Sequence, residues 1–167
     1  MEAEVMSATD LAQFIEERGI AAEIVFLEDE TPTVEAAASA VGVHPSQILK
    51  SVLFVVKEGA DDLRPVLVVA NGLSRISYKK LADYLGVSRR QVRIAQPAQV
   101  RELTGYAVGT VPPFGHRQSL QTLLDEGVID EDEVYAGGGA INALIHLRVA
   151  EMQRVLNAEV VALSEEP

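Results

Sequence analysis

Hydrophobic residues recur along this chain at two spacings, one typical of helices and one typical of buried strands. Within residues 7–18, Leu11, Phe14 and Ile15 have the spacing of one helical face, and Gly19 follows as a stop. That periodicity predicts an amphipathic helix that ends at the glycine.

Cap residues predict where the next helices begin and end. Thr33 can cap a helix over residues 34–41 that ends at Gly42, and Pro45 can occupy the first turn of a short third helix. Further helices are predicted at 77–85, near 98–103 and at 149–157.

Two continuous apolar runs, SVLFVVK at 51–57 and PVLVVA at 65–70, have the length of core strands. Shorter strand-like segments lie at 21–27, 92–95, 120–125, 133–137, 142–147 and 159–163. Helices and strands are mingled without regular βαβ spacing, and no linker interrupts them. The pattern therefore predicts a single α+β domain over residues 1–167, built around a mixed sheet.

Composition narrows the class of protein. The chain has 167 residues, of which 48% are hydrophobic and 23% charged, as in ordinary globular proteins. It has no cysteine, which excludes disulfides, thiol nucleophiles and thiolate metal sites. No apolar run approaches the roughly 20 residues of a membrane span, and the acidic start MEAEVMSATD is unlike a signal peptide. We therefore expect a cytoplasmic protein with no membrane partner.

The charge is unevenly distributed. The net charge is −11, yet residues 75–93 hold six basic residues and one acid, a net +5 against −16 for the remainder. Either this window is an ordinary solvated surface, or it docks a polyanion on an otherwise repelling protein. Its basic residues, the candidates for contact with such a polyanion, are Arg75, Lys79, Lys80, Arg89, Arg90 and Arg93.

A near-repeat links residues 38–48 with residues 82–92, each predicting a helix, a glycine stop and a polar restart. The second copy is compatible with a DNA-binding helix-turn-helix whose recognition helix would begin near Ser88. Pro97 follows closely, residues 92–95 favour a strand, and the acidic remainder opposes duplex binding. A DNA-binding regulator is therefore the weakest of the alternatives.

Patterns for metals and cofactors are missing. His44, His116 and His146 are scattered without metal-ligand spacing, so we predict no metal site and no cofactor. The glycine run at 137–139 could approach a phosphate, but such a run is more often a turn.

The segment GTVPPFGH at 109–116 combines two rigid prolines with two glycines, whose backbone is not covered by a side chain. Pro112 and Pro113 fix their φ angles, whereas Gly109 and Gly115 allow a close approach of another chain or a ligand. It is either a rigid turn or a cradle whose amides meet a substrate.

Lys50 stands directly before the first apolar run. A lysine at that place loses hydration unless its ammonium group extends to solvent or meets an anion. Extension to solvent is the more common outcome for an isolated lysine.

The order of these motifs resembles the YbaK/ProX family of free-standing aminoacyl-tRNA deacylases, which are related to the editing domain of bacterial prolyl-tRNA synthetases. The likeness runs from about residue 33 to residue 163. It rests on the order of five features: a helix, the sequence VGV at 41–43, the sequence QILKS at 47–51, a G-x-x-x-P loop at 109–113 and a glycine-rich turn at 137–139. The resemblance implies a curved mixed sheet, partly barrel-like and surrounded by helices, without a metal or cofactor.

The resemblance also implies roles for individual residues. Lys50 and Gly109 would be catalytic, the lysine holding the terminal nucleotide or the developing charge. Water would attack the ester with help from the ribose hydroxyl of the substrate. The implied substrate-binding residues are Ser51, Thr110, Val111, Pro112, Pro113, Gly115, Gly137, Gly138 and His146. The proline is doubled at Pro112 and Pro113, which departs from the family pattern. His146 lies near the place where some relatives carry a histidine that contacts the substrate.

Two functions therefore compete beside the DNA-binding alternative. The first is hydrolysis of mischarged tRNA that carries a small amino acid, with tRNA-Pro as the leading candidate. The second is tRNA binding by a non-catalytic relative. Aminoacyl-tRNA is the expected partner, and an aminoacyl-tRNA synthetase is a further candidate.

Overall fold

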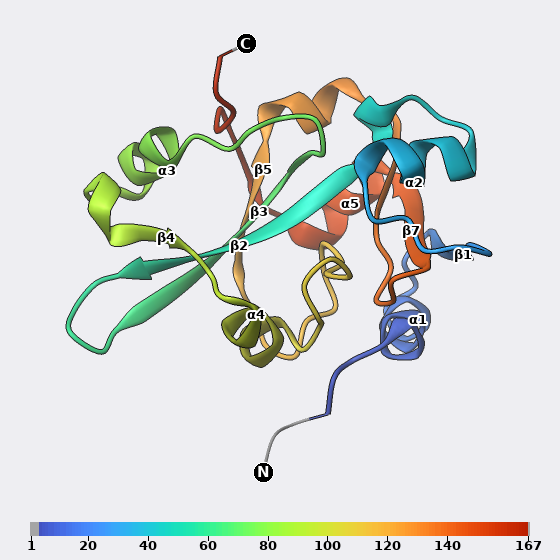
Figure 1. Ribbon diagram of the computed structural model, residues 1–167, viewed down its shortest axis with the longest axis horizontal. Coiled ribbons are helices and arrows are strands. Elements are labelled where there is room, and N and C mark those ends of the chain that lie inside the picture. Colours follow the sequence, from blue (N-terminus) through green and yellow to red (C-terminus); the bar gives the residue numbers. More distant parts are fainter. Residues whose placement is uncertain (1–3, 167) are drawn as a thin grey trace.

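The computed structural model of the chain describes residues 4–166 (Figure 1). Its α-helices are α1 (Ala8–Glu17), α2 (Val34–Val41), α3 (Tyr78–Leu85), α4 (Pro97–Thr104) and α5 (Val149–Leu156). Its strands are β1 (Ala22–Phe26), β2 (Leu49–Lys57), β3 (Leu63–Asn71), β4 (Val92–Ile94), β5 (Gln121–Asp125), β6 (Glu133–Gly137), β7 (Ala143–Arg148) and β8 (Glu159–Val161). Short 3-10 helices are η1 (Pro45–Gln47), η2 (Arg89–Gln91) and η3 (Glu126–Asp130). Each α-helix, and each strand from β1 to β7, overlaps a segment predicted from the sequence, and β8 lies within the apolar segment 159–163.

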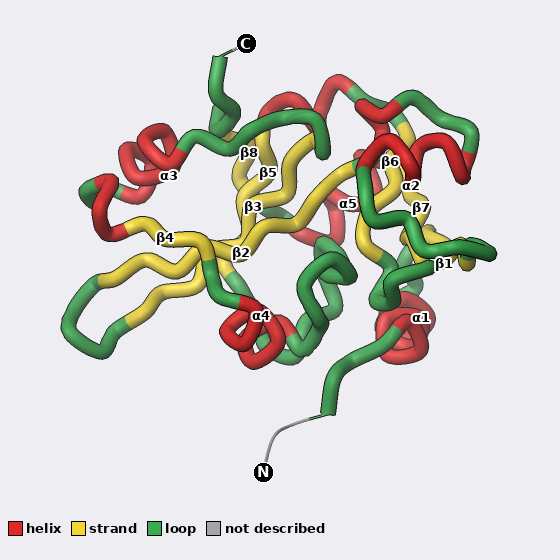
Figure 2. The backbone as a smooth tube through the Cα atoms, in the orientation of Figure 1, coloured by secondary structure: helices red, strands yellow, loops and turns green. Residues whose placement is uncertain are grey.

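The strands form two sheets (Figure 2). The larger is mixed, in the order β4-β2-β3-β5-β8, with β2 antiparallel to β3 and β4 and with β5 parallel to β3 and β8. The smaller is antiparallel, in the order β1-β7-β6. A parallel bridge between Ile48 and Tyr135 joins the two, and they do not close into a barrel. The predicted α+β class and mixed sheet are confirmed, and the implied barrel-like curvature amounts to two sheets that meet at this bridge.

The long apolar run of β2 is explained by burial on both faces. Leu49, Leu53 and Val55 belong to a core cluster that also takes in side chains of β6 and β7. Phe54 and Val56 point the other way, into a second cluster under α3. A strand covered on both faces loses the alternation of polar and apolar residues, which is why this segment is continuously hydrophobic.

The second copy of the near-repeat does not form a helix-turn-helix. After α3 and its glycine cap, η2 contains only three residues, and the chain then enters β4. A recognition helix cannot form there because Val92, Arg93 and Ile94 pair with β2. No helix of the described residues is long and apolar enough to cross a membrane.

Candidate active site

A cavity of about 220 Å³ lies where β2 begins, between the two sheets and α2. It is lined by residues from the start of β2, from the loop after α4 and from the turn after β6. Five residues predicted from the sequence line it together, namely Lys50, Ser51, Gly109, Val111 and Gly137. Residues up to 87 positions apart in the chain thus share one small chamber.

Lys50 is half-buried at the rim of this cavity. Its Nζ donates a hydrogen bond to the backbone carbonyl of Ser74. Partial burial lowers the pKa of the Lys50 ammonium below its ordinary value, and the nearby charge of Arg75 lowers it further. An ammonium group has three N–H donors, so the bond to Ser74 leaves two of them for a substrate oxygen.

Ser51 places a buried hydroxyl at the same cavity. Its Oγ is inaccessible and has no hydrogen-bond partner among the described residues. An unpaired buried hydroxyl lowers the stability of the fold by about 1–3 kcal/mol, so such groups are rare in folded proteins.

The loop at Gly109 is a tight turn with few available amides. Gly109 has φ +88°, and a Cβ built on it would meet no described atom within 4 Å. The Thr110 amide already donates to the Ala107 carbonyl at 3.1 Å, and prolines have no N–H. Among residues 109–111, the amides of Gly109 and Val111 make no backbone hydrogen bond that the structure describes, so they are the donors at this cavity that could meet a ligand.

The rest of the loop is buried and supports the turn. Pro112, Pro113 and Gly115 are buried and lie outside the cavity at Lys50. The Tyr106 hydroxyl donates to the Gly115 carbonyl at 3.1 Å, and His116 Nε2 donates to the Pro112 carbonyl at 2.7 Å. Burial lowers the pKa of His116, and the bond to the carbonyl acts in the opposite direction. Pro112, Pro113 and Gly115 therefore stiffen the loop and do not line the cavity.

The glycine-rich turn packs against this loop. A side chain on Gly137 would overlap the backbone carbonyl of Val111, and one on Gly138 would overlap the backbone of β7. Gly139 donates its amide to the Thr110 carbonyl at 2.9 Å. The glycines therefore let the two backbone segments touch, which holds the turn at Gly109 in place.

His146 lies outside the cavity. It is on β7, with Nδ1 3.1 Å from a carboxylate oxygen of Glu23 and Nε2 3.7 Å from one of Glu133. Its ring stacks on Tyr135 at a centroid distance of 4.4 Å. The structure places this histidine in a polar cluster of the smaller sheet rather than beside Lys50.

The six basic residues of the window 75–93 lie on neighbouring elements. Lys79 and Lys80 are on α3, Arg89 and Arg90 on η2, Arg93 on β4 and Arg75 in the loop before α3. All are exposed except Lys80, which is half-buried and donates to the Ser164 carbonyl at 2.7 Å. Arg75 is near enough to Lys50 to affect its pKa, so the window reaches toward the cavity.

Sequence reasoning missed part of the cavity. Val34 and Ala37 of α2 and Ile141 line it, and Ser74 holds the lysine. The Asn-Gly pair before Ser74 could have indicated a turn at that place. A glycine is needed at position 72 because a Cβ there would overlap the Val34 side chain and the Ile48 carbonyl oxygen, to which the Gly72 amide donates at 2.7 Å.

Comparisons with known proteins agree on one family. The model of the family described as "Aminoacyl-tRNA editing domain" matches residues 28–155. A proline–tRNA ligase of Limosilactobacillus fermentum is 30% identical over 117 residues, 68% of this chain and 20% of the ligase. The chain thus spans about a fifth of the length of that ligase.

A free-standing relative is matched over most of its length. The multifunctional Ser/Thr-tRNA deacylase ProXp-y of Escherichia coli is 28% identical over 128 residues, 76% of this chain and 75% of that protein. The crystal structure of a protein proposed as a trans-editing enzyme for prolyl-tRNA synthetase superposes with a TM-score of 0.86 and 36% identity. That alignment covers 95% of this chain and 97% of the other.

Proposed function

The chain belongs to the aminoacyl-tRNA editing domain family, and we propose that it is a trans-editing deacylase. It would hydrolyse the ester bond of a mischarged tRNA that carries a small amino acid. One observation carries the proposal beyond the family: Lys50, Ser51, Gly109 and Val111 line one cavity, with a cation, a hydroxyl and unused amides.

These groups suit the charge that develops during ester hydrolysis. When a nucleophile adds to the ester carbonyl, its oxygen becomes negative, and fixed N–H donors aimed at that oxygen lower the barrier. The amides of Gly109 and Val111 are the donors we assign to it. Lys50 would hold the phosphate or sugar oxygens of the terminal nucleotide, or share the developing charge.

Water is the attacking group that we propose. The chain has no cysteine, and Ser51 has no hydrogen-bonded base among the described residues to activate it. Water would add to the carbonyl carbon, the bond to the ribose oxygen would break, and that oxygen would take up the proton. A ribose hydroxyl of the substrate would help to position the water.

The size of the cavity limits the aminoacyl group. Its volume of about 220 Å³ is below the ~300–1,000 Å³ of ordinary small-molecule pockets, and Val34, Ala37 and Ile141 form part of its wall. Such a pocket excludes large side chains by overlap and discriminates weakly among small ones. The relatedness to proline–tRNA ligases makes tRNA-Pro the first tRNA to test.

The basic window would bind the tRNA backbone. Its exposed arginines and lysines give a local cationic surface on a chain whose net charge is −11. Phosphate contacts of this kind supply most of the sequence-independent affinity for nucleic acids. An aminoacyl-tRNA synthetase is the second partner that we propose, by analogy with the domain's position within the ligase.

A deacylation panel tests the function. Purified protein is incubated with tRNA-Pro charged with alanine, serine, threonine, cysteine or proline, and the remaining ester is followed over time. We expect hydrolysis of one or more small noncognate esters and protection of the cognate one. Binding of tRNA without hydrolysis of any ester would show instead a non-catalytic member of the family.

A further inference from the structure

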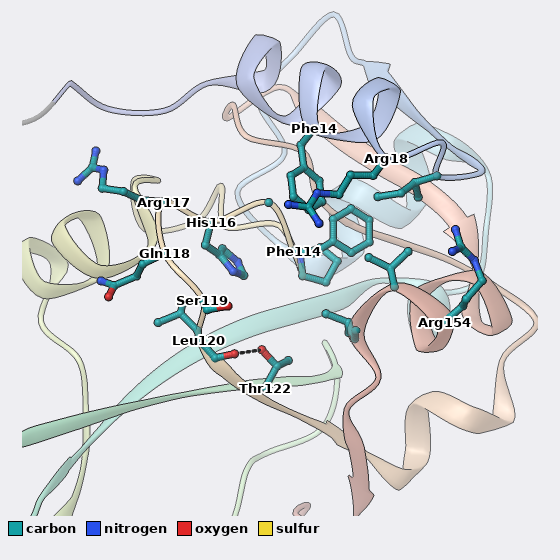
Figure 3. Close-up of a pocket in the computed structure, with 15 residues that line it drawn as sticks. Phe14, Arg18, Phe114, His116, Arg117, Gln118, Ser119, Leu120, Thr122 and Arg154 are labelled. Atoms are coloured by element: carbon teal, nitrogen blue, oxygen red, sulfur yellow. Dashed lines mark hydrogen bonds between the residues drawn. The ribbon is translucent and has the colours of Figure 1, made fainter.

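A second cavity, of about 740 Å³, lies between α1, α5 and the segment 113–122 (Figure 3). None of its lining residues lines the cavity at Lys50. The two are nevertheless connected, because Gly109 and Val111 line one and the continuation of the same loop, from Pro113 to Leu120, lines the other.

The charge of this groove is opposite to that of the molecule. Of the described residues, Arg18, Arg117 and Arg154 line it, and no acidic residue does. Two other open cavities are each lined by three acidic residues, Glu28, Asp29 and Glu30 in one and Asp125, Glu126 and Asp130 in the other. A groove that is free of carboxylates on a chain with 25 acidic residues favours an anionic ligand.

The three guanidinium groups differ in their availability. Arg154 forms a two-point pair with Glu151, at 2.6 and 2.9 Å. Arg117 donates to backbone carbonyls, the shortest bond being 2.6 Å to Glu4. Arg18 has no carboxylate partner among the described residues, and its guanidinium lies 4.5 Å from the centre of the Phe14 ring. Arg18 is therefore the arginine of this groove whose guanidinium N–H donors make no hydrogen bond among the described residues and are left for a ligand.

Arg18 is the outer layer of a stack. Under it, the rings of Phe14 and Phe114 are 5.8 Å apart with an angle of 25° between their planes. Figure 3 shows the Arg18 guanidinium beside these two rings and His116 reaching toward the same space. Guanidinium planes and aromatic rings are the surfaces on which unpaired RNA bases stack, while the positive charge attracts the adjoining phosphate.

We propose that this groove is a second RNA-contact site, in which Arg18 binds a phosphate of the tRNA and, supported by the Phe14 ring beneath it, stacks its guanidinium plane on an unpaired base. The identification of the RNA as tRNA rests on the proposed function. The groove does not take part in hydrolysis, since it shares no residue with the cavity at Lys50.

Salt-dependent binding of uncharged tRNA tests the electrostatic part. Arg18→Glu is compared with Arg64→Glu, which makes the same charge change at a partly exposed arginine that lines neither cavity. We expect only Arg18→Glu to reduce the log–log salt slope, by about 0.7–0.9 for one lost phosphate contact. Equal slopes in the two variants would overturn the proposal.

Oligonucleotides test the stacking part. Arg18→Gln should weaken binding of a short unpaired RNA about tenfold and leave binding of a duplex of the same length nearly unchanged. Phe14→Leu should do the same, with its melting temperature as the check on folding. An equal loss for both RNAs would overturn the assignment to an unpaired base.

A minimal substrate separates this proposal from the proposed function. Aminoacyl-adenosine should be hydrolysed by Arg18→Gln at the wild-type rate, because that ester occupies only the cavity at Lys50. If the wild-type protein hydrolyses no ester but its RNA binding depends on Arg18, the proposed deacylase function is wrong and the proposed RNA-contact site stands. Slower hydrolysis of aminoacyl-adenosine by Arg18→Gln would reject the separation of the two sites.

Discussion

Residues 33–50 and 77–94 form two copies of one structural unit, and only the first copy reaches the candidate active site. Each begins with a hydroxyl cap: Thr33 accepts a backbone hydrogen bond at 3.0 Å, and Ser77 accepts one at 3.1 Å at the equivalent place. Each continues through a helix, a glycine, a 3-10 turn and a strand. The near-repeat in the sequence is therefore a repeat of backbone structure.

The agreement extends to the turns. Gly42 and Gly86 have φ angles of +73° and +71°, and each closes its helix in the left-handed region. In the 3-10 turns, Gln47 and Gln91 each accept from the turn's first amide and donate to a carbonyl of a neighbouring strand, at 3.2 Å to β6 and 2.9 Å to β2.

The copies differ in where the strand goes. The first leads into the central strand β2 and places Lys50 at the cavity. The second leads into the edge strand β4, where the equivalent position is held by Ile94, 51% exposed. The same local unit thus places a half-buried cation at the cavity in one copy and leads to a surface strand in the other. The sheet position of the following strand, and not the unit itself, determines the chemistry.

Charge also separates the copies. The first has no lysine or arginine before Lys50, whereas the second carries most of the basic window. One copy would hold the reacting end of the substrate, and the other would hold its backbone. Mutations at equivalent positions can test this division.

The largest effect is expected from Lys50→Ala. If Lys50 shares the developing charge, as we propose, its removal should lower the deacylation rate about 10²–10³-fold, as for loss of one oxyanion donor. Folding should be unaffected, since burial disfavours this ammonium. Ile94→Ala at the equivalent position is the control and should keep the rate. A wild-type rate in folded Lys50→Ala would exclude a catalytic role.

Gly109→Ala should come next, with about a 10²-fold loss of rate. Its methyl group would enter open space at the cavity and disturb the approach of the ester. Gly86→Ala is matched, because that glycine also has a positive φ and no described atom within 4 Å of a Cβ. Both variants should lose about 1–2 kcal/mol of stability from the left-handed backbone, and only Gly109→Ala should lose activity. Equal losses of activity in Gly109→Ala and Gly86→Ala would show that the loop at Gly109 is only a structural turn.

The elements were predictable because their signals are local. Thr33, Gly42 and Pro45 mark the ends of helices by themselves, and the run after Lys50 marks a core strand. The family resemblance supplied the grouping of Lys50 with Gly109, which no local pattern contains. The structure supports it by placing both at one cavity.

Other features depend on contacts that leave no mark in the sequence. The Ser74 carbonyl that holds Lys50 is a backbone group, so any residue there could supply it. The pairing of His146 with Glu23 joins strands 123 positions apart. The groove at Arg18, which no carboxylate of the described residues lines, is assembled from three segments that each contribute a single arginine.

The pH dependence of the rate should depend on Lys50. Its lowered pKa means that the ammonium deprotonates below the usual 10.5, so the enzymatic rate, corrected for spontaneous hydrolysis, should fall in the alkaline range. Stability changes in the opposite sense: the unfolded chain binds this proton more tightly, so stability rises with pH up to about 10.5. Lys50→Arg should abolish the alkaline fall. A fall that persists in Lys50→Arg would assign it to another group.

A smaller effect is expected from the second copy. Arg90→Glu together with Arg93→Glu should weaken tRNA binding several-fold and reduce the log–log salt slope by about 0.7–0.9 per lost contact. Activity on aminoacyl-adenosine should not change, since neither residue lines the cavity. Slopes are measured with uncharged tRNA. An unchanged slope would make this window an ordinary solvated surface.

The smallest effect concerns the shared scaffold. Gln47→Ala and Gln91→Ala each remove the same pair of hydrogen bonds, so each should lower the free energy of unfolding by about 1 kcal/mol. The loss should be somewhat larger for Gln91, whose two bonds are both 2.9 Å, than for Gln47, whose bonds are 3.4 and 3.2 Å. Denaturant melts of the two variants provide the measurement.

Their activities should differ although their stabilities are similar. Gln47 ties η1 to β6 only three residues before Lys50, so its loss should let the lysine move relative to the cavity and lower kcat a few-fold. Gln91 ties η2 to β2 at the far end of that strand, at Lys57, where movement does not reach the cavity. Equal kcat values in both variants would mean that the first copy positions Lys50 through Ser74 alone, and the two units would then be equivalent as scaffolds.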